Sequence, residues 1–185
     1  GFVTWITDQF ARPIGSIQPW VDWVQTQSTR PGFDLHGNWK EFSWWGRAMG
    51  TPKLRPDAAT TQSPDPLRQR VAFALSEIVV AGDRPEAFAG QQRGFANFYD
   101  LMIQHAFGNY RDLLYDVATH PVMGTYLSHL NNQKANPAAN TYPDENFARE
   151  IMQLFSIGLW QLNQNGTRVE VGGQLVPTYS NADIT

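Results

Sequence analysis

Large apolar side chains recur every three or four residues through most of this 185-residue chain. That spacing places them on one face of an α-helix, because a helical turn takes about 3.6 residues. Proline, glycine and polar stretches interrupt the pattern, so we expect several helices of ordinary length. The expected helices cover residues 2–11, 17–28, 38–49, 66–81, 94–107, 109–119, 121–130 and 144–160.

The helical pattern gives way to turn and strand signals near residue 162. Asn165-Gly166 is a strong hairpin turn sequence, and apolar and polar residues alternate over Arg168–Val171. Gly172-Gly173 is a second turn signal, after which residues 174–179 can return as a strand. The sequence therefore predicts a mainly α fold, a multi-helix, bundle-like domain with a small C-terminal β-hairpin.

The two ends of the chain suggest a segment of a longer protein. The apolar helical pattern is already under way at Phe2, and Ser180 to Asp183 has the spacing of a capping box, which opens a helix. We therefore expect residues 180–185 to be the start of a truncated helix. The other expected parts are N-terminal helices (1–50), a proline-rich arm or loop (51–66), a helical core (67–161) and the hairpin (162–179).

Composition excludes several chemistries. The chain has no cysteine, which excludes a disulfide scaffold, a thiolate metal site and a cysteine nucleophile within it. Its net charge is −3, unlike the basic footprint of a nucleic-acid binder, so we expect no nucleic-acid partner. The strictly apolar runs, such as Ile78–Ala81, are too short to span a membrane. No dinucleotide or phosphate-loop motif is present, and we expect no cofactor.

One cluster of polar side chains could carry catalysis. Asp144, Glu145, Arg149 and Glu150 stand at the start of an expected helix, and His129 leads into the polar loop before it. In a hydrolase, the carboxylates would act as acid and base and the arginine would hold an anion. A structural interpretation is also open. Glu145 and Arg149 have the i, i+4 spacing of a helical ion pair, and acidic residues suit a helix N-terminus.

Two further features have functional and structural interpretations. His105, His120 and His129 offer imidazole ligands, but their spacing matches no common metal motif, so we expect no metal site and keep a metal protein as the weakest alternative. Trp44 and Trp45 are adjacent, and adjacent residues cannot share one helix face. One of them is expected to pack against another segment or a partner, which predicts an interaction surface.

Several long runs of the chain resemble one bacterial family. They are Leu67–Ile78, Tyr99–Leu114, His120–Ser128 and Pro143–Leu159, with a looser match in Gly1–Pro13. In these runs the chain is similar to the family known as domain of unknown function 1800. Thr178–Ile184 is similar to the start of a further helix in that family. The resemblance implies a bacterial, mostly helical and often exported protein that is typically longer than this chain. It implies no reaction and supplies no catalytic residues.

Two functions are therefore expected from different classes. The first is an exported helical protein that binds a protein partner or joins a larger assembly at the cell envelope. The alternative is a periplasmic or extracellular hydrolase that uses the Asp144–Glu150 cluster with His129. Either function places the protein in the periplasm, outside the cell or at the envelope.

Overall fold

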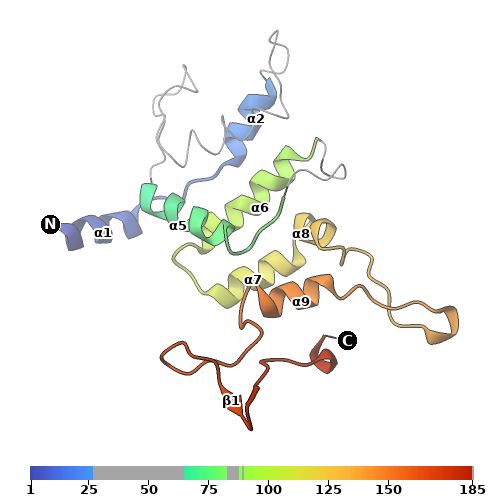
Figure 1. Ribbon diagram of the computed structural model, residues 1–185. Coiled ribbons are helices and arrows are strands. Elements are labelled where there is room, and N and C mark those ends of the chain that lie inside the picture. The colour runs from blue at the N-terminus through green and yellow to red at the C-terminus, as the bar shows by residue number, and fades with distance from the viewer. Residues whose placement is uncertain (27–64, 83–87, 89, 185) are drawn as a thin grey trace. The chain divides into compact units, whose positions relative to one another are not determined.

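The protein is mainly α-helical with a small antiparallel hairpin near the end of the chain (Figure 1). A computed structural model describes residues 1–26, 65–82, 88 and 90–184. The expected helix at 38–49 and most of the proline-rich arm lie outside these residues. The described helices are α1 (Phe2–Ala11), α2 (Gln18–Thr26), α5 (Pro66–Ser76), α6 (Gln92–His105), α7 (Tyr110–Thr119), α8 (Pro121–Tyr126) and α9 (Asn146–Gln153).

The chain divides into two compact units, Gly1–Val122 and Met123–Thr185. In the first unit, α6 packs against α2, α5 and α7, and α5 also packs against α1. The segment 66–81 is apolar on most sides, a pattern typical of a central helix, but among the described helices α6 packs closely against more helices than α5 does. Side chains from four of these helices form the buried core, among them Val21, Ala72, Phe95, Met102, Ile103, Leu113 and Val117.

Two buried carboxylates hold the segment between α1 and α2 in the first unit. Asp100 of α6 accepts hydrogen bonds from the Ser16 hydroxyl at 2.6 Å and from the Ile17 N–H at 2.7 Å. Asp65, which precedes α5, accepts one from the Gly15 N–H at 2.8 Å. Asp65 and Asp100 are 0% and 5% exposed. Buried carboxylates are stable only when such donors satisfy them, so this connection fixes where α1 and α2 leave the core.

The second unit has a small core and an extended C-terminal part. Its buried apolar side chains, among the described residues, are Met123, Leu127 and Phe155. Strands β1 (Glu170–Val171) and β2 (Gln174–Leu175) pair antiparallel across Gly172-Gly173, as the sequence predicts. Outside these two strands, Leu162 and Arg168 form an isolated antiparallel bridge across the Asn165-Gly166 turn.

Three helices end earlier than their apolar patterns predict. The helix expected over 66–81 ends as α5 at Ser76. The helix expected over 121–130 ends as α8 at Tyr126, and Ser128 and Asn131 follow with φ values of 64° and 63°. The helix expected over 144–160 ends as α9 at Gln153, and Gly158 has a φ of 75°. Left-handed backbone cannot continue a right-handed helix, and the apolar spacing beyond these points belongs to turns.

The expected capping box at the end of the chain is present. The Ser180 N–H donates to the Asp183 carboxylate at 2.7 Å, and the box opens the short 3₁₀ helix η4 (Asn181–Asp183). The Ser180 hydroxyl also donates to this carboxylate. Both hydrogen bonds lower the pKa of Asp183.

No helix in the described part of the chain is both long and apolar enough to cross a membrane.

Replacing Asp100 should destabilise the first unit strongly. Asp100→Ala leaves the buried Ile17 N–H without its acceptor, which should lower the free energy of unfolding by about 2–4 kcal/mol. Ser16→Ala removes a single hydroxyl donor and should lower it by about 1 kcal/mol. Urea titration with circular dichroism measures both changes. Glu170→Ala, at an exposed position, serves as the control, and equal midpoints for Asp100→Ala and this control would contradict the account.

Candidate functional site

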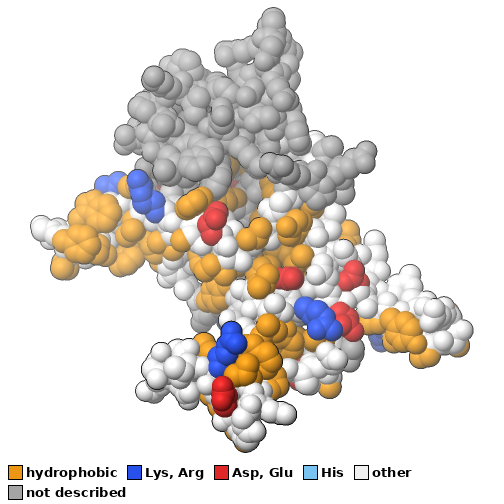
Figure 2. All heavy atoms as spheres, viewed as in Figure 1, with side chains coloured by type: hydrophobic (Ala, Val, Ile, Leu, Met, Phe, Trp, Pro, Cys, Tyr) orange, Lys and Arg blue, Asp and Glu red, His pale blue; other side chains and the backbone are white. Residues whose placement is uncertain are grey.

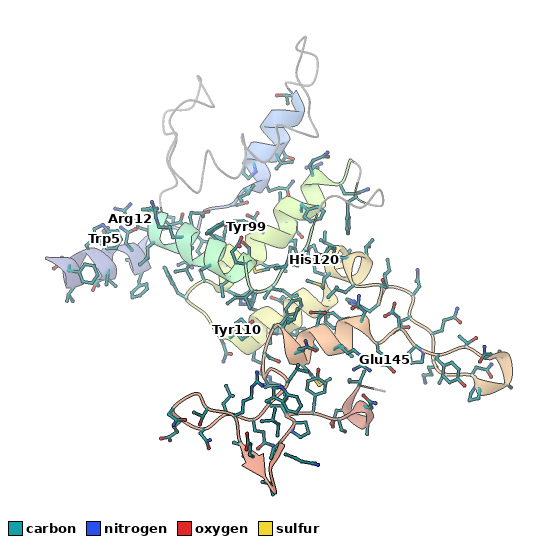
Figure 3. All side chains as sticks on the ribbon, in the orientation of Figure 1. Trp5, Arg12, Tyr99, Tyr110, His120 and Glu145 are labelled. Atoms are coloured by element: carbon teal, nitrogen blue, oxygen red, sulfur yellow. The ribbon has the colours of Figure 1, made fainter. Side chains whose placement is uncertain are left out.

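The carboxylate of Asp144 lies at the start of α9 and acts as a local cap. It accepts a hydrogen bond from the Asn146 N–H at 2.8 Å. Glu145 follows, and its carboxylate lies 2.6 Å from the Arg149 guanidinium one turn further along the helix. Figure 3 labels Glu145 at this helix start. Both side chains are partly exposed, so the pair is of the kind that stabilises a helix end modestly.

His129 reaches α9 through an aromatic contact. Its ring lies 4.0 Å from the Phe147 ring, centroid to centroid, with an angle of 31° between the planes. Glu150 is half-buried on the same helix. The structure therefore brings His129 to one side chain of α9, while Glu145 and Arg149 contact each other. The catalytic role of the five predicted residues stays a prediction.

Asn132 closes the polar loop that precedes α9, and sequence reasoning assigned it no role. Its side-chain amide donates to the Asp144 carbonyl and accepts from the Asp144 N–H, both at 2.8 Å. The side chain at one end of the segment 133–143 thus holds the backbone at its other end. A single asparagine in an asparagine-rich loop carries no signal for such a contact, because its partner is backbone twelve residues away.

The other two described histidines, His105 and His120, contact different side chains. His105 contacts the Asp116 carboxylate at 2.6 Å. The Nδ1 atom of His120 accepts from the Val122 N–H at 3.1 Å, and its Nε2 atom lies 3.0 Å from the Asn97 side-chain oxygen. Burial lowers the pKa of His120 below the ordinary value of 6.5. Within the described residues, no group of three or more His, Asp or Glu side chains could hold a metal ion.

A pocket of about 420 Å³ lies in the first unit, apart from the predicted polar cluster in sequence. Its lining includes Phe10 of α1, Arg68 of α5 and Phe107, which follows α6. The Arg68 guanidinium lies 4.4 Å from the centre of the Phe107 ring, and the Phe10 ring meets Phe107 edge-on at 4.6 Å. The sequence assigns neither Phe10 nor Arg68 a role in a site, since nothing local shows that these segments meet.

Helix α1 carries a large exposed apolar surface. Phe2 and Val3 are each 77% exposed, and Trp5 is 46% exposed. Figure 2 shows hydrophobic side chains gathered over α1, and Figure 3 labels Trp5 on it. The predicted interaction residues Trp44 and Trp45 lie outside the described residues, and their role stays a prediction.

Comparison with known proteins gives a family but no activity. The family described as "Protein of unknown function (DUF1800)" matches residues 4–185, nearly the whole chain. The chain belongs to the DUF1800 family. No curated protein and no solved structure matches this chain. The family resemblance of the motifs is therefore confirmed, and the function of this DUF1800 chain has to be argued from its own residues.

Breaking the Asn132 contact should loosen the loop before α9. Asn132→Ala removes both hydrogen bonds to Asp144 and should lower the free energy of unfolding by about 1 kcal/mol. Urea titration measures the change, with Gln133→Ala at the exposed neighbouring position as the matched control. If the two variants unfold at the same urea concentration, the loop does not depend on Asn132.

His120 should make stability depend on pH. Its neutral form is favoured in the folded chain, so its contribution is fully present above pH 6.5 and is lost as the pH falls towards the lower pKa of the folded state. His120→Gln should therefore lose less stability than the unmodified chain below pH 6.5. Urea unfolding at a series of pH values measures this difference. An NMR titration of the His120 ring with a midpoint at or above 6.5 would contradict it.

Proposed function

We propose that this DUF1800 chain is an exported helical component that binds a protein partner in an assembly at the cell envelope. We further propose that α1 forms the contact surface. The observation that supports this most directly is the exposure of Phe2, Val3 and Trp5, which are all at least 46% exposed. Exposed apolar surface costs about 25 cal/mol per Å² relative to burial, so a contiguous apolar face favours association.

The spacing on α1 favours a partner with an apolar groove. Phe2, Trp5, Ile6 and Phe10 follow the i, i+3, i+4, i+8 order that places side chains along one face of a helix. A helix of this kind binds by laying that face into a groove, with large side chains as anchors. Phe10 is 53% exposed even though its ring also contacts Phe107.

The charges around α1 favour a protein over an anionic membrane surface. Helices that bind anionic lipid carry lysine and arginine beside their apolar face. The sequence of α1 contains neither, and its one charged residue is Asp8. Arg12, just beyond the helix, is paired with Asp8 at 2.9 Å. The proposal therefore commits to a protein partner, and export to the envelope is inferred from the family resemblance.

The second unit adds to this proposal. Leu154, Ile157, Leu159 and Leu162 are each at least 43% exposed. A unit with a small core and this much exposed apolar surface is typical of a component whose neighbours complete it. No contact among Asp144, Glu145, Arg149, Glu150 and His129 specifically favours the hydrolase alternative, which stays a prediction.

Photo-crosslinking in the producing bacterium tests the proposal. A benzoylphenylalanine at position 3 should give one discrete protein adduct, recovered from the periplasmic or envelope fraction. The same probe at position 115 is the matched control, because Val3 and Tyr115 are 77% and 69% exposed on different helices. The double variant Phe2→Ser, Trp5→Ser should reduce the adduct by about fivefold or more, since it removes two exposed anchors.

Several results would contradict the proposal. They are the absence of any adduct at position 3, the same adduct at position 115, and an adduct of two copies of this chain. A lipid adduct would favour a membrane surface instead, and recovery from the cytoplasmic fraction would contradict export.

A further inference from the structure

The guanidinium of Arg68 lies in the interior of the first unit, and the described residues leave most of its donors without an acceptor. Arg68 is 6% exposed, although it stands in the first turn of α5. A guanidinium carries five N–H donors, and buried donors cost free energy when they lack acceptors. In the described part of the chain, its hydrogen bond is a long one, from Nη1 to the Ile103 carbonyl at 3.4 Å. The buried Nε atom makes no hydrogen bond there.

Asp65 offsets the charge of Arg68 but does not satisfy its donors. The Asp65 carboxylate lies 3.5 Å from the Arg68 Nε atom, beyond a good hydrogen bond. The same carboxylate accepts from the Gly15 N–H at 2.8 Å and from the Gln69 amide at 3.3 Å. The guanidinium therefore keeps the capacity to donate to a planar oxyanion.

The cavity beside Arg68 has the size and the walls of a small-molecule site. Its volume of about 420 Å³ lies within the range of ligand pockets, which is about 300–1,000 Å³. Phe107 lies under the guanidinium, and the Phe10 ring stands edge-on to Phe107, so two aromatic rings line the same pocket as the charged group. Aromatic walls beside one arginine suit a ligand that joins an anion to an apolar body.

We propose that this pocket binds a small monocarboxylate with a flat apolar body. The N–H groups of the Arg68 guanidinium would hold the carboxylate, and the rings of Phe10 and Phe107 would pack against the apolar part of the ligand. A single negative charge fits better than the double charge of a phosphate, because Asp65 already places a buried carboxylate beside Arg68. This site shares Phe10 with the apolar face of α1, whereas the contact surface proposed on α1 centres on Phe2, Val3 and Trp5.

Calorimetric titration of the full chain with three probes tests the proposal. 3-Phenylpropionate should bind saturably at one site. The affinity for its neutral amide, 3-phenylpropionamide, should be lower by about tenfold or more, because the amide lacks the charge that pairs with arginine. Inorganic phosphate should bind more weakly than 3-phenylpropionate, because it has no apolar body to contact the rings.

Three variants connect binding to the pocket. Arg68→Lys keeps the charge but loses the planar fork, and should weaken 3-phenylpropionate binding by about tenfold. Phe10→Ala removes a half-exposed ring, which the fold tolerates more readily, and should weaken the same probe. Arg70→Lys, at an exposed position on the same helix, is the matched control and should leave binding unchanged. Circular dichroism confirms that each variant is folded.

Four results would overturn the proposal. The first is no saturable binding of 3-phenylpropionate, and the second is equal binding of its amide. The third is tighter binding of inorganic phosphate, which would replace the carboxylate with a phosphate site. The fourth is unchanged binding in both Arg68→Lys and Phe10→Ala. Phe2→Ser and Trp5→Ser leave this titration unaffected, so failure here and failure of the proposed partner contact are distinguishable.

Discussion

The arrangement of the helices in the first unit depends on hydrogen bonds between residues 15–17 and two buried carboxylates. Asp65 precedes α5 and Asp100 lies on α6, and each accepts a hydrogen bond from a backbone N–H of the short connection between α1 and α2. A carboxylate in the core is stable only with such donors, and a buried backbone N–H needs an acceptor. Both requirements are met at once, so the direction in which α1 leaves the core is set by hydrogen bonds as well as by packing.

Both proposed sites depend on that direction. The connection holds α1 so that Phe10 meets Phe107, and this contact forms one side of the pocket beside Arg68. The same arrangement leaves Phe2, Val3 and Trp5 exposed along α1. The hydrogen bonds of Asp65 and Asp100 therefore position both the proposed pocket for a small anion and the apolar face of α1 for a protein partner.

Local sequence patterns predicted the elements but not the contacts between distant segments. Spacing and turn signals predicted α1, α7, the Asn165-Gly166 turn and the capping box at Ser180. The i, i+4 pairing of Glu145 with Arg149 was also readable as an ion pair. Asp100, Asn132 and Arg68 were not recognisable, because their partners lie 83, 12 and 35 residues away. A polar side chain whose partner is distant in sequence reveals its role only when the fold brings the two together.

Hydrogen exchange at the captured backbone tests the central claim most directly. If Asp65 and Asp100 hold the connection as described, the N–H groups of Gly15 and Ile17 should exchange as slowly as those of buried α6 residues such as Met102 and Ile103. Such protection requires opening of the core, not local fraying. Exchange at Gly15 and Ile17 as fast as in the exposed loop 133–140 would contradict the account.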